Sequence, residues 1–293
     1  MKEGQSSSTA LLIAHAVLLA EATPKLRMLL PERAATLTRQ LLASASGSRG
    51  FDVLLRYRIT RTILLAHERV LLPGIIVHWL TRKLLLEAWA SEALAAGCRQ
   101  LVVLGAGFDT LAQRLHETTA CFEMDHPPTQ AVKRAAFPDG PALVPLDFLD
   151  ASPMTTLREH ARFDAKLPTF YIAEGLLMYL PPPRVTELFR ELAAFSAPGS
   201  RFAFTFMEAR ENRPLGFANA SPVINWWLRW RGEPFRWGLA RDEVSDFVRA
   251  LGWRLLALGS VAELRARFLA PRGLADAPLA AGESIALAEL CTT

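Results

Sequence analysis

The segment from residue 101 to residue 125, LVVLGAGFDTLAQRLHETTACFEMD, constrains the fold of this chain more than any other. An apolar run of strand type leads into a glycine turn at Gly105 and Gly107, and a helical pattern follows. A second apolar run then ends at the acidic residues Glu123 and Asp125. This order of strand, turn, helix, strand and acid predicts the first β-α-β unit of a nucleotide-binding sheet.

Each part of this unit has a physical role. Glycines permit a sharp turn and let a ligand approach the backbone. An acid at the end of the second strand can accept hydrogen bonds from both hydroxyls of a ribose. Gly107 and Asp125 are 18 residues apart, near the ~20 of dinucleotide-binding fingerprints. The third glycine of that fingerprint is replaced by Thr110, so a structural turn without a ligand is the alternative.

Strand and helix patterns alternate from residue 99 onward, whereas the first 96 residues are predicted to be helical. This alternation predicts an α/β fold with a doubly wound, mostly parallel seven-stranded sheet, which binds ligands at the carboxyl ends of its strands. We divide the chain into an N-terminal helical cap region, 1–96, and a nucleotide-binding domain, 97–293. The expected strands are 101–104, 121–124, 143–146, 170–173, 201–206, 253–258 and 284–290. The expected helices are 8–22, 32–44, 52–70, 74–96, 109–117, 128–136, 153–161, 183–196, 241–251 and 261–269.

An aromatic-rich insertion, residues 208–239, interrupts the alternation. It follows the fifth expected strand and is therefore placed to cover the ligand end of the sheet. A helix that packs its aromatic face on the sheet is an equal alternative, because buried aromatic side chains mostly build cores. The insertion holds four of the seven tryptophans of the chain, Trp226, Trp227, Trp230 and Trp237.

Composition excludes several classes of function. The chain has 33 basic and 29 acidic residues and a net charge of +4, which is too mild to predict a nucleic-acid partner. The three cysteines and six histidines are dispersed without metal-ligand spacing, so we expect no metal site and a reducing, cytoplasmic location. No run reaches the ~18 uncharged apolar residues of a transmembrane segment.

Three sequence blocks resemble one known family. LVVLGAGFDT, FEMDHPPTQAVK and YIAEGLLMYLPP are similar to the leucine carboxyl methyltransferase-like family of S-adenosylmethionine-dependent O-methyltransferases, whose bacterial branch includes enzymes placed near secondary metabolism. The similarity runs from about Leu72 to about Phe206. It implies the class I methyltransferase (Rossmann-like) fold, S-adenosyl-L-methionine as the cofactor, and transfer of a methyl group to a carboxylate or hydroxyl of a small molecule or peptide.

The resemblance also implies which residues contact the methyl donor. Asp125, the second acid of the E-x-D element, is expected to bind the ribose diol, and Glu123, on the same strand face, is its rival. Gly105 and Gly107 would let the donor lie against the backbone. Family members carry an arginine near Arg82 that binds the methionyl carboxylate, and a guanidinium fork suits a carboxylate.

Further candidates follow the third and fourth expected strands. Asp147 and Phe148 stand where related folds recognise adenine, although Asp147 is equally a candidate cap of a strand end. Glu174 is expected near the amino group of the donor. Tyr179 follows in the same block and is either a hydrogen-bonding group of the site or a core aromatic. We take Glu174 and Tyr179 as the catalytic candidates, and Lys83 as the competitor of the arginine clamp.

The nature of the acceptor follows from weaker signals. No histidine-acid or lysine pair marks a general base at a strand end, and neither His78 nor His126 is assigned that role. Carboxyl-methylating relatives share the AEGLLMYL block, and a carboxylate is already ionised near pH 7. We therefore expect a carboxylate rather than a hydroxyl. An NAD(P)-dependent oxidoreductase and a non-catalytic nucleotide-binding module remain the alternatives.

Overall fold

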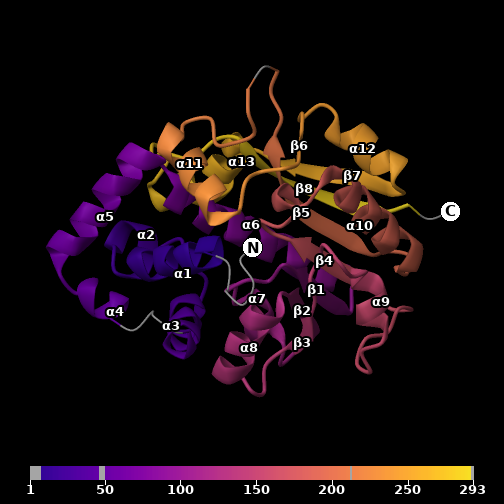
Figure 1. Cartoon of the computed structure of the whole chain (residues 1–293). Coiled ribbons are helices and arrows are strands. Elements are labelled where there is room, and N and C mark those ends of the chain that lie inside the picture. Colours follow the sequence, from indigo (N-terminus) through magenta and orange to yellow (C-terminus); the bar gives the residue numbers. More distant parts are fainter. Residues whose placement is uncertain (1–7, 46–49, 212, 292–293) are drawn as a thin grey trace.

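The computed structural model describes residues 8–45, 50–211 and 213–291. In these residues an eight-stranded sheet has the order β3-β2-β1-β4-β5-β8-β7, and β6 pairs with β5 (Figure 1). The strands are β1 (Gln100–Leu104), β2 (Ala120–Asp125), β3 (Ala142–Pro145), β4 (Thr169–Ala173), β5 (Arg201–Glu208), β6 (Gly238–Leu239), β7 (Trp253–Gly259) and β8 (Glu283–Leu290).

The sheet is mostly parallel, as predicted. Strands β1 to β5 run parallel to one another, and β8 is antiparallel to both β5 and β7. All seven expected strands are present. The eighth, β6, has only two residues and pairs with Met207 and Glu208 at the end of β5. It comes from the aromatic-rich insertion, where no strand was predicted.

The order of the strands places a topological switch point at β1. The chain fills the positions β1, β2 and β3 on one side and then returns to place β4 on the other side of β1. In open α/β sheets of this kind, ligands bind at the carboxyl ends of the strands beside the switch point. A ligand site is therefore expected at the carboxyl ends of β1, β2 and β4.

Helices cover both faces of the sheet (Figure 1). The N-terminal helices are α1 (Ser8–Glu21), α2 (Pro24–Arg27), α3 (Ala34–Ser44), α4 (Phe51–Leu54), α5 (Arg58–Leu71) and α6 (Ile75–Ala95). Those that follow are α7 (Leu111–Leu115), α8 (Pro127–Ala136), α9 (Pro153–Arg158), η1 (Leu177–Tyr179), α10 (Pro182–Phe195), α11 (Pro222–Arg231), α12 (Val244–Ala250), α13 (Val261–Leu264), η2 (Arg265–Leu269) and η3 (Ala270–Arg272).

Two hydrophobic cores lie on opposite faces of the sheet. Leu101 and Val103 of β1 belong to one core, and Val102 and Leu104 to the other, as the two-residue period of a strand requires. The first core also holds side chains of α1, α3 and α6. The N-terminal helices and the sheet therefore share a core, although the expected boundary at residues 96 and 97 does fall between α6 and β1.

The helix expected at 52–70 is interrupted. It forms as α4 and α5, with an extended residue, Tyr57, before α5. The Arg61 guanidinium donates hydrogen bonds to the carbonyl oxygens of Leu55 (2.7 Å) and Arg56 (3.1 Å). These bonds satisfy carbonyls that a continuous helix would have bonded itself, which explains a break that the hydrophobic pattern does not show.

The aromatic-rich insertion contributes both to the core and to the surface. Trp237 is buried, whereas Trp226 and Trp230 of α11 are each 60% exposed and stack with their ring centroids 6.4 Å apart. The side chain of Trp227 lies outside the described part of the chain. Trp237 therefore packs into the core, whereas Trp226 and Trp230 lie on the surface.

In the described residues no single helix is long and apolar enough to cross a membrane. Only α5 and α6 taken together reach that length, and they are bent by 89° at the break between them. Helix α6 packs Leu80, Leu86 and Trp89 into the core.

Candidate functional site

A cavity of about 780 Å³ opens at the carboxyl ends of β1, β2 and β4. Its walls also include side chains of α1, α5, α6 and the insertion. Every site residue predicted from the sequence lines this cavity: Arg82, Gly105, Gly107, Asp125, Asp147, Phe148, Glu174 and Tyr179. The topology thus brings together residues from five separate segments of the chain, and we call this space the sheet cavity.

The glycine turn is tightly packed. Gly105 and Gly107 have φ angles of +68° and +49°, in the left-handed region that favours glycine. A Cβ at Gly105 would come within 3.0 Å of the Leu176 side chain, and one at Gly107 within 3.2 Å of Ala10 of α1. Helix α1 therefore lies against the turn and forms part of the cavity wall.

Asp125 closes the same turn from the end of β2. Its Oδ2 accepts a hydrogen bond from the Gly107 amide (2.6 Å), and its Oδ1 accepts one from the His126 amide (2.6 Å). Burial raises the pKa of the Asp125 carboxyl, and the two amide bonds oppose that rise. A carboxylate has about four acceptor positions. Two therefore remain for the hydroxyls of a ligand.

Glu123, the rival acid, has another role. Its Oε2 accepts a hydrogen bond from Lys133 Nζ (2.7 Å), and both side chains are 2% exposed. Lys133 also donates to the carbonyl of Asp109 (2.9 Å). Of the two acids of β2, only Asp125 lines the sheet cavity. Glu123 instead forms a buried ion pair that joins β2 to α8.

Arg82 is held on two sides by carboxylates. Its Nε donates to Glu174 Oε1 (2.9 Å), and its Nη1 lies 2.8 Å from both oxygens of Glu283. Burial alone would lower the pKa of the guanidinium, but Glu283 and Glu174 raise it above the usual value. The planar fork is therefore fixed before any ligand binds, because both acids are themselves anchored on strands or strand ends.

Glu283 has a second buried partner. Its Oε2 lies 2.8 Å from His78 Nε2, and the side chains are 0% and 1% exposed. Burial opposes ionisation of Glu283, but Arg82 and His78 together lower its pKa to about 2. Arg82, Glu283 and His78 thus form a buried chain of hydrogen bonds that connects α6 to β8.

Lys83 extends the network toward the glycine turn. Its Nζ contacts Asp109 Oδ2 and lies 3.1 Å from Glu174 Oε2. Burial opposes the charge of Lys83, yet Asp109 and Glu174 raise its pKa. Because its ammonium group carries three donors and these two acids use two, one donor is left for a ligand. The geometry therefore keeps Lys83 beside Arg82 as a candidate carboxylate clamp.

Asp147 and Phe148, which follow β3 in the sequence, also line the cavity. Asp147 Oδ1 accepts the Leu149 amide (2.9 Å), and Oδ2 lies 3.6 Å from His126 Nε2. Asp147 therefore caps its own turn, as the alternative interpretation expected, and still borders the cavity. The Phe148 carbonyl accepts two hydrogen bonds from Arg184, which leaves the Asp147 side chain as the acceptor available to an adenine amine.

Tyr179 lies where three parts of the chain meet. Its ring stacks on Phe235 of the insertion at a centroid distance of 5.6 Å. The Thr9 hydroxyl of α1 donates to Glu233 Oε2 of the insertion at 2.5 Å. Burial raises the pKa of the Tyr179 hydroxyl, and the charge of Glu233 raises it further. Tyr179 is therefore a neutral hydrogen-bonding group in the cavity at physiological pH.

Glu283 was not predicted as a site residue. The sequence offers one signal, an acid immediately before the apolar run 284–290. That signal has meaning only because β8 is antiparallel and pairs Glu283 with Met207 near the end of β5. The first residue of an antiparallel strand lies at the same sheet edge as the last residues of its neighbours, and strand direction cannot be read from the run itself.

The sheet cavity is rich in carboxylates. Its described lining includes three residues with permanent positive charge, Arg82, Lys83 and Arg236. It includes seven carboxylates, namely Glu68, Asp109, Asp125, Asp147, Glu174, Glu233 and Glu283. Such a lining favours a ligand with positive charge and disfavours one with several negative charges.

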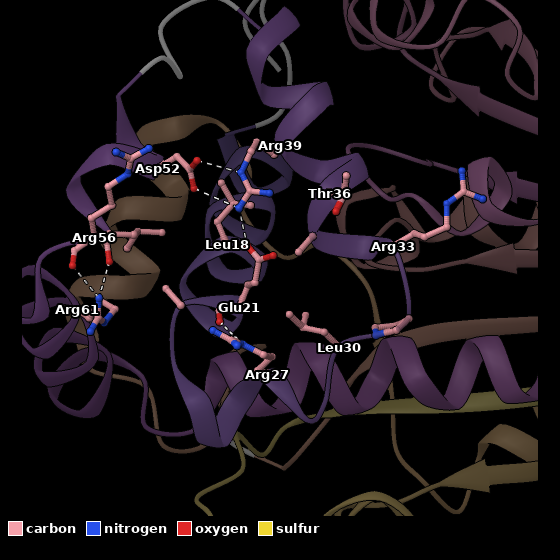
Figure 2. Close-up of a pocket in the computed structure, with 14 residues that line it drawn as sticks. Leu18, Glu21, Arg27, Leu30, Arg33, Thr36, Arg39, Asp52, Arg56 and Arg61 are labelled. Atoms are coloured by element: carbon pink, nitrogen blue, oxygen red, sulfur yellow. Dashed lines mark hydrogen bonds and ion pairs between the residues drawn. The ribbon is translucent and has the colours of Figure 1, made fainter.

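A second cavity, of about 700 Å³, lies among the N-terminal helices (Figure 2). We call it the helix cavity. Figure 2 shows Arg39 between Glu21 and Asp52. Its Nε lies 2.9 Å from Asp52 Oδ2. The lining of the helix cavity includes five arginines and two acids, Arg27, Arg33, Arg39, Arg56, Arg61, Glu21 and Asp52. No residue of the predicted site belongs to it.

Comparison with known proteins agrees with the fold. The family model for leucine carboxyl methyltransferase matches residues 37–193. A candidate S-adenosyl-L-methionine-dependent methyltransferase of Mycolicibacterium gilvum is 36% identical over 190 residues, 61% of each chain. One from Mycobacterium ulcerans is 32% identical over 210 residues, 66% of this chain and 64% of the relative. The matched part thus spans about three fifths of the length of these relatives.

Solved structures of low sequence identity share the fold. A duf574 family protein of Streptomyces avermitilis has a TM-score of 0.58 at 17% identity and covers 88% of this chain and 98% of its own. A candidate methyltransferase of Thermobifida fusca has a TM-score of 0.54 at 18% identity. The match covers 86% of this chain and 93% of that protein. With the family model matching more than half of the chain, the protein belongs to the leucine carboxyl methyltransferase family.

Proposed function

We propose that the protein transfers a methyl group from S-adenosyl-L-methionine to an oxygen atom of an acceptor. Family membership and the similarity to candidate methyltransferases support the reaction class. The observation that carries the proposal is the composition of the sheet cavity. A tightly packed glycine turn, an acid at the end of β2 and an excess of carboxylates line one space.

These features fit the chemistry of this donor. S-adenosyl-L-methionine carries a positive sulfonium and an ammonium group against one carboxylate, so its net charge matches the acid-rich lining. Asp125 would accept the ribose hydroxyls, and Asp147 would accept the adenine amine. Arg82 or Lys83 would bind the methionyl carboxylate, and Glu174 would stand near the ammonium. An NAD(P) pyrophosphate would bring several negative charges to the same lining.

The catalytic task of this chain is then positioning. When bound, S-adenosyl-L-methionine supplies a methyl group already activated by the positive sulfur. The protein has to hold the acceptor oxygen in line with that group and exclude water. Tyr179 and Glu174 line the sheet cavity and would lie beside the methyl group of the bound donor. A carboxylate acceptor would be ready to react, whereas a hydroxyl acceptor must lose a proton.

We further propose that different segments of the chain bind the donor and the acceptor. Residues 97–293 would bind the donor, and the helical cap region 1–96 with the insertion 208–239 would select the acceptor, a small molecule or a peptide. The secondary-metabolism role implied by the bacterial relatives belongs to this proposal. The buried thiols Cys98 and Cys121 support the proposed cytoplasmic location, because free thiols persist in a reducing compartment.

Titration calorimetry on the full chain tests the proposal. S-adenosyl-L-methionine and its demethylated product, S-adenosylhomocysteine, should bind, and NAD⁺ should bind at least about tenfold more weakly, ~1.4 kcal/mol. Preferential binding of NAD⁺ would make the oxidoreductase alternative correct. Binding of the donor without methyl transfer to any member of a broad panel of hydroxyl and carboxyl compounds would instead identify a non-catalytic nucleotide-binding module.

A further inference from the structure

The sheet cavity extends beyond the strand ends into an apolar outer part. This outer part lies between α1, α4, α5, the start of α6 and the insertion. Its aromatic and branched aliphatic side chains include Ile13, Phe51, Leu64, Trp79, Phe217 and Ile224. Apolar walls with few polar groups are typical of sites for small organic ligands, in which the polar groups fix the orientation.

His15 of α1 is a polar group in this apolar wall. Its ring lies against Phe51 with a centroid distance of 4.2 Å and an interplanar angle of 36°. Its Nε2 is shielded from solvent and has no hydrogen-bond partner among the residues that the structure describes. Buried polar atoms in proteins are nearly always bonded. A ligand that offered a partner to Nε2 would therefore gain a contact that the protein itself does not make.

The charge state of His15 selects the kind of partner. Burial lowers the pKa of the imidazole, so the ring is neutral at physiological pH. A neutral imidazole has one nitrogen that donates and one that accepts. It can therefore bind a hydroxyl in either direction, but it supplies no charge to balance a carboxylate.

The remaining charges of the cavity also disfavour a carboxylate acceptor. Of the three lining residues with permanent positive charge, Arg82 and Lys83 are bonded to acids of the buried network. The third, Arg236, is exposed, so solvent weakens its attraction for an anion. A carboxylate in the apolar part would be desolvated near Glu233 without a buried cation to compensate it.

We propose that the acceptor is an uncharged, ring-bearing molecule whose hydroxyl group is held by His15. This inference rests on the proposed methyl transfer and names the substrate class of the same cavity. The rings would lie along the apolar wall formed with Phe51 and Trp79, and the hydroxyl would bond to Nε2. It departs from the carboxylate expected from the sequence, an expectation that rested on the lack of a general base at a strand end and on the carboxyl-methylating relatives.

Binding of a matched pair of probes tests this proposal. We would titrate 2-naphthol and 2-naphthoate, which share one ring system, into the full chain saturated with S-adenosylhomocysteine at pH 7. The wild type should bind 2-naphthol at least tenfold more tightly than 2-naphthoate. His15→Phe keeps an aromatic ring but removes Nε2, and it should weaken 2-naphthol at least fivefold while leaving naphthalene unchanged. His15→Gln restores a polar group and should recover most of the affinity.

Controls separate this contact from loss of structure. His116, whose Nδ1 bonds to the Gln113 carbonyl (2.8 Å), does not line the cavity, and His116→Phe should bind both probes as the wild type does. Tighter binding of 2-naphthoate, abolished by Arg236→Gln, would show a carboxylate site and overturn the proposal. Binding of neither probe would overturn it as well. S-adenosylhomocysteine affinity, measured in the same samples, shows separately whether the proposed methyl-donor site fails.

Discussion

The sheet cavity and the helix cavity are similar in volume but differ in how their charged groups are held. In the sheet cavity, Arg82 binds acids that are 92 and 201 residues away in the sequence, and it is 3% exposed. In the helix cavity, Arg39 binds acids 18 and 13 residues away, and its side chain is 40% exposed.

This difference separates a ligand site from a junction between helices. The helix cavity contains more arginines, but Arg27 and Arg61 donate to backbone carbonyls of neighbouring turns (Figure 2). These bonds serve the connections between α1, α2, α4 and α5. The sheet cavity has fewer cations, yet two of them, Arg82 and Lys83, are fixed by acids from distant elements. Removing charged groups from water costs desolvation free energy. Charged side chains that are nevertheless held in fixed positions inside a protein are typical of functional sites.

The largest expected effect is on the buried network of the sheet cavity. Glu283→Ala would leave Arg82 without one of its two carboxylates and should lower the free energy of unfolding by about 3–5 kcal/mol. Urea denaturation measures this change. Glu289→Ala is the matched control on the same strand. Glu289 pairs with Arg201 and Arg254, and its loss should cost about 1 kcal/mol or less. Equal losses for the two variants would contradict the distinction between buried and exposed pairs.

The free energy of unfolding should depend on pH through the ionisation of Glu283 in the same network. The pKa of Glu283 is about 2 in the folded protein, below its ordinary value of 4.5. Its contribution is therefore complete above pH 4.5 and is lost as the pH falls toward 2. Glu283→Gln should flatten the stability curve in this window. An unchanged curve, measured by denaturation at a series of pH values, would mean that Glu283 is not ionised in the native state.

The next effect concerns the ribose contact. Asp125→Ala should weaken both S-adenosyl-L-methionine and methylthioadenosine by at least about tenfold, ~1.4 kcal/mol, because both ligands contain the ribose. Titration calorimetry with both ligands measures their affinities for the wild type and for Asp125→Ala. Undiminished affinity in the mutant would assign the ribose to another residue.

A smaller and more selective effect is expected at the clamp. Arg82→Lys keeps the charge but loses the planar fork, and it should weaken S-adenosyl-L-methionine by about fivefold, ~1 kcal/mol. Methylthioadenosine lacks the amino-acid part and should bind as before. Lys83→Met, tested in parallel, shows which of the two cations contacts the methionyl carboxylate. Equal loss of both ligands in Arg82→Lys would indicate damage to the fold rather than loss of a clamp.

The smallest effect is expected in the helix cavity. Arg39→Ala breaks a pair of half-exposed ion pairs and should change the free energy of unfolding by at most about 1 kcal/mol. Donor affinity should stay at the wild-type value. A large loss of donor binding in this variant would mean that the two cavities are coupled. The helix cavity would then be more than a junction between helices.

Much of the fold was predictable because local signals agreed with the global arrangement. The β1–β2 unit, the glycine turn and Asp125 follow from spacing and strand type, and all eight predicted site residues line one cavity. Glu283 escaped prediction because its position depends on the antiparallel direction of β8. The break at Tyr57 depends on hydrogen bonds from the Arg61 side chain to backbone carbonyls, and the position of His15 depends on its packing against Phe51. The hydrophobic pattern of the sequence contains neither contact.

A crystal structure of the protein with S-adenosylhomocysteine would test the central claim most directly. The ribose hydroxyls should bond to the Asp125 carboxylate, with the adenine beside Asp147 and the amino-acid end at Arg82, Lys83 and Glu174. A nucleoside bound elsewhere, such as among the arginines of the helix cavity, would contradict the assignment of the sheet cavity as the donor site.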